Sequence, residues 1–194
     1  MAKADLPVLS FASQKAWEKW LGAQAADAAG VWLKLPKKSA PDPSVTKPQA
    51  IESALAHGWI DGQIDRFDAD WFLTRFTPRK SQSRWSKINC DTAERLIRAG
   101  RMKARGLREV ERAREDGRWK AAYAGQASAT VPKDLQAALN AHPKAKAFFA
   151  TLNSVNRYAI LYRVGAAKKP ETRAARIAKF IAMLERGERI HEKK

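Results

Sequence analysis

The segment 59–89 holds the densest set of side chains that could bind a ligand. It contains three Trp together with several Arg and Ser residues and two Asp. Aromatic walls with a few convergent polar groups are typical of ligand pockets, and arginine forks with serine hydroxyls suit phosphate or carboxylate groups. We therefore predict a site for an anionic ligand or partner, lined by Trp59, Asp61, Arg79, Ser83, Trp85, Ser86 and Asn89.

The same residues also have a purely structural interpretation. Trp59 and Trp85 can anchor a hydrophobic core, because large aromatic side chains are mostly buried. Asp61 can hold an arginine in place, and Asn89 can help to cap a helix. The residue types do not decide between a pocket and a scaffold, so both interpretations stay open.

Asp61 is the candidate catalytic residue of an interpretation in which the protein is an enzyme. Arg79 and Asn89 would then act as its electrophilic partners. Asp65 is in phase with Asp61 along one strand, but four steps of roughly 3.3 Å place the two carboxylates about 13 Å apart. Paired glycosidase carboxylates lie about 5–10 Å apart, so an acid–base pair would need a bulge at Gly62. The sequence favours a non-enzymatic protein without deciding the question.

No pattern in the sequence predicts a metal or a cofactor. His57, His142 and His191 are isolated and Cys90 is the single cysteine, so the spacing of zinc ligands is absent. The sequence has no Walker A loop and no Gly-x-Gly-x-x-Gly loop. Cys90 lies near an expected helix start, which leaves two interpretations, a reactive thiol or a small buried core residue.

The positive charge is uneven along the chain. The sequence carries 37 Lys and Arg against 20 Asp and Glu, a net charge of +17. Residues 1–74 hold 8 basic and 9 acidic side chains, whereas 75–123 hold 15 and 6, and 124–194 hold 14 and 5. This excess favours an anionic partner: a small anion, an acidic protein or, without sequence specificity, a nucleic acid. The expected face for such a partner consists of Lys168, Lys169, Arg173 and Arg176, which could alternatively form a solvated helix exterior.

Capping signals and hydrophobic periodicity predict the elements that position these residues. Ser13 predicts the start of a helix that ends by Gly30, and Thr46 begins a capping box for a second helix. Alternating residues predict strands, which together would form a small antiparallel sheet, at 31–35, 59–67 and 71–76.

After Pro78 the pattern is helical. A capping signal at Asp91 predicts a helix up to Gly100. Further helices are expected over 104–116 and from Pro132, Pro143, Ser154 and Pro170. The predicted fold class is α+β, with a small antiparallel sheet and packed helices in the N-terminal part and a helical C-terminal unit. The small, polar stretch 125–130 is the best linker, so we expect domains 1–124 and 125–194, the second packed on the first.

The expected location is the cytoplasm. No apolar run approaches the roughly 18 residues that a membrane span needs. The N-terminal residues Met1–Ser10 lack the apolar stretch of a secretory signal, and a single cysteine suits a reducing compartment. The sequence does not indicate an oligomeric state.

Several short motifs occur in the order found in a known protein family. They are Gly58-Trp-Ile-Asp-Gly62, Phe76-Thr-Pro-Arg79, Ser83-Arg-Trp-Ser-Lys-Ile-Asn89, Gly100-Arg-Met102, Val131-Pro-x-Asp-Leu135, and Ala167-Lys-Lys-Pro-Glu-Thr-Arg173 followed by Arg176-Ile177. Over residues 10–187 the chain resembles the bacterial YdeI/OmpD-associated family, also called bacteriocin-protection proteins.

The resemblance implies a role in stress and antimicrobial-peptide resistance. A periplasmic location has been suggested for the family, whereas the missing secretory signal favours the cytoplasm here. Our leading hypothesis is a non-enzymatic stress- or bacteriocin-protection-type protein with a Trp/Arg/Ser-lined site in segment 59–89. The alternatives are a basic protein associated with nucleic acid, and an enzyme that uses Asp61. A protein of charge +17 repels a cationic peptide, so protection would be indirect.

Overall fold

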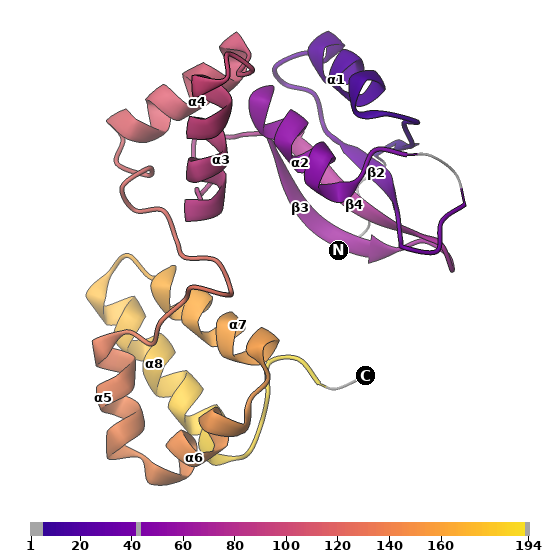
Figure 1. Cartoon of the computed structure of the whole chain (residues 1–194). Helices are drawn as coiled ribbons and strands as arrows, with labels where there is room; N and C mark the ends of the chain where they lie inside the picture. The colour runs from indigo at the N-terminus through magenta and orange to yellow at the C-terminus, as the bar shows by residue number, and fades with distance from the viewer. Residues whose placement is uncertain (1–5, 42–43, 193–194) are drawn as a thin grey trace. The chain divides into compact units, whose positions relative to one another are not determined.

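A computed structural model describes residues 6–41 and 44–192 of the chain. It divides into two compact units, Met1–Ala122 and Tyr123–Lys194, here called the N-terminal and C-terminal units (Figure 1). The first combines helices with a four-stranded sheet and the second is helical, which confirms the predicted α+β class. No helix in the described ranges is long and apolar enough to cross a membrane. Part of the Met1–Ser10 segment, residues 1–5, lies outside the described residues.

The sheet has the strand order β1-β2-β4-β3. Its strands are β1 (Val8–Leu9), β2 (Val31–Pro36), β3 (Trp59–Arg66) and β4 (Trp71–Pro78). The three longer strands are antiparallel neighbours, as the sequence predicts, whereas β1 pairs in parallel with β2 and makes the sheet mixed. This strand of two residues was not expected, because so short a segment has no periodicity.

The pairing of β3 with β4 contains an extra residue in β3. Asp61 lies opposite Phe76 and Ile64 lies opposite Thr74, so three steps on β3 match two steps on β4. Such a bulge reverses the alternation of side chains beyond it. Asp65 therefore lies on the opposite face of the sheet from Asp61. The prediction that these two carboxylates share a face was wrong.

Helices α1 (Gln14–Ala23) and α2 (Lys47–Ala56) cover one face of the sheet (Figure 1). The Ser13 hydroxyl accepts a hydrogen bond from the Ala16 N–H, and Thr46 forms the predicted capping box. Helix α1 ends before Gly30 because Gln24 already has extended backbone. Side chains from both helices and the sheet form the core, namely Trp17, Leu21, Val31, Leu33, Leu35, Val45, Ala50, Ala54, Trp59 and Phe76.

Helices α3 (Lys87–Arg98) and α4 (Ala104–Glu115) complete the N-terminal unit. Helix α3 begins at Lys87 rather than at the predicted Asp91, because the Ser86 hydroxyl accepts the Asn89 N–H at 3.1 Å and starts the helix earlier. A second core forms between these helices and the end of α2. It consists of Leu55, Ala56, Trp85, Cys90, Ala93, Leu96, Met102, Val110 and Ala113.

The C-terminal unit consists of four helices around a core of its own. They are α5 (Lys133–Ala141), α6 (Pro143–Thr151), α7 (Ser154–Gly165) and α8 (Pro170–Glu185). Asn153 caps α7, one residue before the predicted Ser154, since its side chain accepts the Asn156 N–H at 2.9 Å. The core includes Leu135, Leu139, Phe149, Ile160, Val164, Ile177, Phe180, Ile181 and Leu184.

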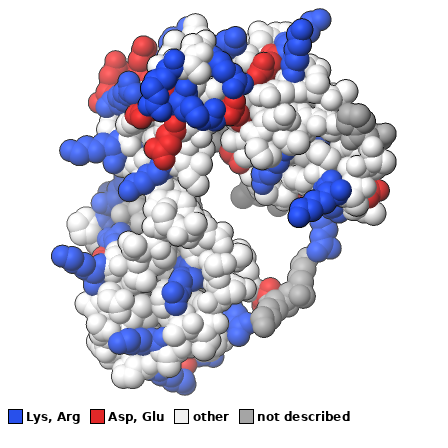
Figure 2. All heavy atoms as spheres, viewed as in Figure 1, with Lys and Arg blue, Asp and Glu red and all other residues white. Residues whose placement is uncertain are grey.

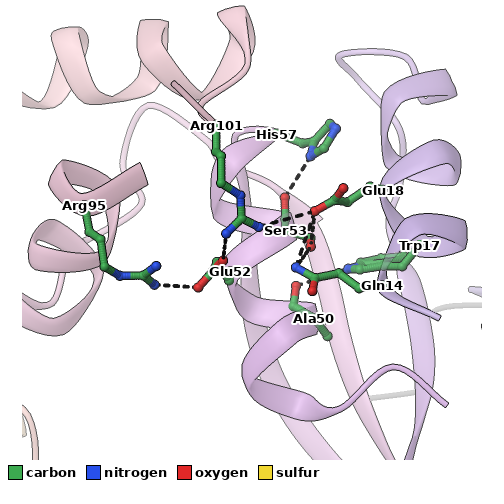
Figure 3. A network of polar contacts seen from close by, with 9 residues as sticks. All are labelled: Gln14, Trp17, Glu18, Ala50, Glu52, Ser53, His57, Arg95 and Arg101. Atoms are coloured by element: carbon green, nitrogen blue, oxygen red, sulfur yellow. Dashed lines mark hydrogen bonds and ion pairs between the residues drawn. The ribbon is translucent and has the colours of Figure 1, made fainter. Parts of the chain in front are cut away.

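Glu52 on α2 joins three parts of the N-terminal unit. Its carboxylate pairs with Arg95 on α3 and, at 2.6 Å, with Arg101 in the segment between α3 and α4 (Figure 3). The hydrogen bond from Arg95 lowers the pKa of Glu52 against the opposing effect of burial, and Arg101 lowers it further. One carboxylate thus holds the α3–α4 pair against α2.

Replacing Glu52 by Gln is expected to lower the free energy of unfolding at pH 7 by about 1 kcal/mol, since the arginines are half exposed and solvent screens the pair. Because folding lowers this pKa, the stabilisation is present above the ordinary value of 4.5 and is lost as the pH falls through the folded value. Urea denaturation at pH 7 and at pH 3 measures both effects.

The matched control is Glu94→Gln, since Glu94 faces Arg114 at 3.8 Å with both side chains about half exposed. It should change stability by less than about 0.5 kcal/mol. If Glu52→Gln behaves like this control at pH 7, Glu52 does not hold the helices together.

Cys90 is a buried core residue rather than a reactive thiol. Its side chain packs in the α2–α3–α4 core. Burial raises the pKa of the Cys90 thiol to about 11, and the neighbouring Asp91 charge raises it further. The structure therefore favours the second of the two interpretations that the sequence left open.

With this pKa, fewer than about one thiol in a hundred is ionised at pH 8, and thiolate is the reactive form. We expect the native protein to react with a disulfide reagent such as Ellman's reagent at least about a hundredfold more slowly than the urea-unfolded chain. Equal rates in the two states would contradict the buried, protonated thiol.

Candidate functional site

A pocket of about 580 Å³ lies at the end of the hairpin where β3 begins and β4 ends. It is beside the loop that follows α1. We call it the hairpin pocket. Residues 26–29 of the loop form one wall and the two strands form the others. The charged and polar side chains in its lining are Asp27, Asp61, Gln63, Arg75, Thr77, Arg79 and Lys80.

Of the seven predicted ligand-binding residues, two line this pocket. They are Asp61 on β3 and Arg79 just after β4. The remaining five lie elsewhere in the N-terminal unit and are absent from the lining: Trp59, Ser83, Trp85, Ser86 and Asn89.

Trp59 and Trp85 belong to two different cores. Trp59 is 0% exposed and packs edge-on against Trp20 in the sheet core. Trp85 is 1% exposed and lies 4.9 Å from Trp119, ring centre to ring centre, in the core between α3 and α4. Neither indole presents a face to a ligand, so the scaffold interpretation describes both.

The two serines and Asn89 organise the chain between β4 and α3. The Ser83 hydroxyl accepts the Lys80 N–H at 2.9 Å and closes a turn. Ser86 caps α3 by accepting the N–H of Asn89. These three residues determine how the chain enters α3, and they do so with local hydrogen bonds.

Arg79 is held rigidly although it carries a charge. It is only 6% exposed, and its guanidinium carbon lies 3.8 Å from the centre of the Trp85 ring. Its Nη1 donates to the Arg84 carbonyl at 3.3 Å, and its backbone N–H donates to the Gly58 carbonyl. A guanidinium over an indole face is stabilised by the cation–π interaction. Trp85 therefore helps to fix the orientation of Arg79, which lines the pocket.

Arg75 and Lys80 also line the pocket, although neither was among the predicted ligand-binding residues. Arg75 sits on the central strand β4, directly before the partner of Asp61. The sequence offered no signal for Arg75, because the strand pairing at this end of the hairpin depends on the extra residue in β3. Within the described residues, Asp61 has no hydrogen bond or ion pair and the buried Arg75 Nε has no partner.

The lining of the pocket has an excess of positive charge. Three cations face two carboxylates, and no His, Cys or Ser side chain occurs in the lining. Asn89, the second partner in the enzyme hypothesis, lies at the start of α3 and not in this pocket. No group of three or more His, Cys, Asp or Glu within the described ranges is placed to hold a metal ion.

A polar network on α2 contains the residue types of a catalytic triad but not the hydrogen bonds of one. The Ser53 hydroxyl donates to Glu18 at 2.9 Å, and the His57 ring nitrogen Nδ1 bonds to the Ser53 carbonyl oxygen at 2.8 Å (Figure 3). A nucleophilic serine needs its hydroxyl bonded to the base. Ser53 therefore serves to connect α1 and α2.

Two of the four residues of the predicted basic face of the C-terminal unit form hydrogen bonds within that unit. Arg173 pairs with Asp134, lowering the pKa of that carboxyl below its ordinary value, and also donates to the Val164 carbonyl at 3.0 Å. Arg176 donates to the Arg163 carbonyl at 2.6 Å. Both arginines thus satisfy carbonyl groups at the end of α7. The other two residues, Lys168 and Lys169, are exposed before α8.

The cations of the α3–α4 part lie among carboxylates. Figure 2 shows Lys and Arg gathered there with Asp and Glu between them. Among the described residues, the ion pairs in this part are Arg95–Glu52, Arg101–Glu52, Arg101–Glu18, Arg112–Glu109, Arg114–Glu94 and Arg118–Asp116. Five of the 15 cations of residues 75–123 are therefore paired with a carboxylate.

The chain matches two family models. Residues 9–109 match the model described as a domain of unknown function (DUF8412), and residues 128–187 match the one described as "Bacteriocin-protection, YdeI or OmpD-Associated". No curated protein and no solved structure shows a significant match.

The resemblance stated from the motifs is therefore confirmed in the C-terminal unit, over 128–187. The motifs before residue 109 fall within the other match, which covers more than half of the 194 residues. The chain belongs to the family of the domain of unknown function DUF8412, and its C-terminal unit carries a segment that matches the bacteriocin-protection, YdeI or OmpD-associated family.

Proposed function

We propose that this protein is a non-enzymatic, bacteriocin-protection-type protein whose N-terminal unit binds a small anionic ligand in the hairpin pocket. The protection role is supported by the family match over 128–187. The ligand site is supported by one observation above all: Arg75, Arg79 and Lys80 line a single pocket of about 580 Å³.

The arrangement favours a ligand with a carboxylate or phosphate group. A guanidinium offers a planar set of donors that matches these groups, and Arg79 keeps a fixed orientation because it lies against Trp85. Little conformational entropy is then lost when the ligand binds. Lys80 is exposed at the pocket and adds a mobile charge.

Asp61 narrows the class of ligand further. Its carboxylate lines the same pocket and has no hydrogen-bond partner among the described residues. A ligand that carries a hydroxyl or amino group beside its anionic group would satisfy this acceptor while it neutralises the arginines. Hydroxy acids and sugar phosphates have this combination.

A protein of net charge +17 repels a cationic peptide, so we propose that protection is indirect and acts through the bound anion. A cytoplasmic location belongs to the same proposal, since a small anionic metabolite is available there.

The binding test uses titration calorimetry at low salt with citrate, inorganic phosphate and glucose 6-phosphate as probes. We expect at least one of them to bind the wild type and to bind Arg75→Gln and Lys80→Gln about tenfold more weakly, because each change removes one charge-assisted hydrogen bond. Lys80 is exposed, so its variant keeps the fold.

Arg66→Gln is the matched control, since Arg66 is an exposed residue of β3 that does not line the pocket. It should bind the probe as the wild type does. The ligand site is refuted if none of the probes binds, or if all three variants lose affinity to the same extent, which would indicate a general charge effect.

A further inference from the structure

A second pocket, of about 410 Å³, lies elsewhere in the N-terminal unit and shares no residue with the hairpin pocket. We call it the α4 pocket. It is bounded by the end of α1, by His57 after α2, and by the first turn of α4. Its lining residues are Leu21, Gly22, His57, Lys103, Ala104, Arg105 and Arg108.

Among the described residues, no side-chain cap is found at the first turn of α4. Lys103 at the N-cap makes no side-chain hydrogen bond, and the first turn contains no acidic residue. The N–H groups at the start of a helix lack intrahelical acceptors, and the helix dipole makes this end favourable for negative charge. Helix N-termini with these properties commonly bind phosphate.

Close packing fixes the position of this helix end. A Cβ atom on Gly106 would lie 2.3 Å from the Ala56 carbonyl oxygen, so only glycine allows α4 to approach the end of α2 this closely. The Lys103 N–H donates to the same carbonyl at 3.0 Å. The remaining N–H groups of the turn are thus presented by a rigid backbone.

His57 is an independent sign that the pocket receives a polar group. It is 8% exposed, and its Nδ1 bonds to the Ser53 carbonyl, which fixes the hydrogen on Nδ1 and the orientation of the ring (Figure 3). The other ring nitrogen, Nε2, lies next to Gly22 at the pocket and has no hydrogen bond among the described residues. Because the rest of the His57 side chain is buried, Nε2 is the atom through which it can bond to a polar group in the pocket.

The charges around the pocket have one sign. Lys103 and Arg108 are exposed and form no ion pair within the described residues. Arg105 is committed to structure, since its guanidinium donates to the Gln24 carbonyl at 2.9 Å and to the Ala25 carbonyl at 3.3 Å. The lining contains no carboxylate.

We infer that the α4 pocket binds a phosphate dianion. The N–H groups of the first turn and the side chains of Lys103 and Arg108 donate to its oxygens. The His57 Nε2 accepts from a protonated phosphate oxygen when the ring is neutral, or donates when the ring is charged. The volume exceeds that of a phosphate ion, so the same chemistry admits a free phosphate or a phosphate monoester.

The test is an NMR titration of the full-length, ¹⁵N-labelled protein with inorganic phosphate and, separately, with glycerol phosphate. We expect the amide signals of Ala104, Arg105 and Gly106 to shift and saturate with either probe. Tighter binding of glycerol phosphate would identify an ester as the ligand, and equal or tighter binding of inorganic phosphate would identify the free ion.

Two variants are designed to abolish this binding. The double variant Lys103→Gln/Arg108→Gln should bind phosphate at least about tenfold more weakly. Gly22→Leu should abolish binding, because Gly22 is an exposed helical position next to the His57 Nε2 and a leucine there fills the pocket without disturbing the core. Circular dichroism and the melting temperature verify the fold of each variant.

The matched control is Lys87→Gln/Arg98→Gln, which removes the same charge from exposed positions of α3 outside both pockets. In this control, and in Arg75→Gln, phosphate should still shift the amide signals of Ala104, Arg105 and Gly106 with unchanged affinity, because these signals report the α4 pocket and not the hairpin pocket. The inference is overturned if phosphate leaves the three amide signals unshifted, if Gly22→Leu still binds, or if the control loses as much affinity as the double variant.

Discussion

The N-terminal unit depends above all on the pairing of β3 with β4. This hairpin supplies Trp59 and Phe76 to the core beneath α1 and α2, and it contributes Asp61 from β3 and Arg75 from β4 to the hairpin pocket. Its last residues lead directly to Arg79, which lies against Trp85 in the neighbouring core. Core, pocket and the path into α3 are therefore all determined by one strand register.

Much of the fold could be predicted from local signals. Ser13 and Thr46 mark helix starts because a hydroxyl before a helix has a specific acceptor role, and alternating residues mark the three longer strands. Local signals could not predict the bulge in β3, because an extra residue is recognised only from the pairing of two strands. Helix α3 begins before Asp91 because the Ser86 side chain accepts the Asn89 N–H, a signal that the sequence analysis did not select.

The candidate site was predictable in part, for a reason that lies in tryptophan itself. A Trp side chain buries about 150–250 Å² and dominates whichever core it can reach, so its presence near polar residues says little about a ligand. Trp59 and Trp85 are both buried in cores, whereas Asp61 and Arg79 line a pocket. The charged residues were therefore better indicators of the site than the aromatic ones. Arg75 was not predictable, because the strand pairing at that end of the hairpin depends on the bulge in β3.

The side chain of Arg105 has a consequence for the two pockets together. It starts from α4, beside one pocket, and holds the carbonyls of Gln24 and Ala25, whose next residues, 26–29, form a wall of the other. Arg105 thus connects the α4 pocket to the loop that lines the hairpin pocket. Any ligand that changes the hold of Arg105 on these carbonyls also changes the position of that wall. Where a ligand does so, linkage requires that the effect on binding at the other pocket be reciprocal.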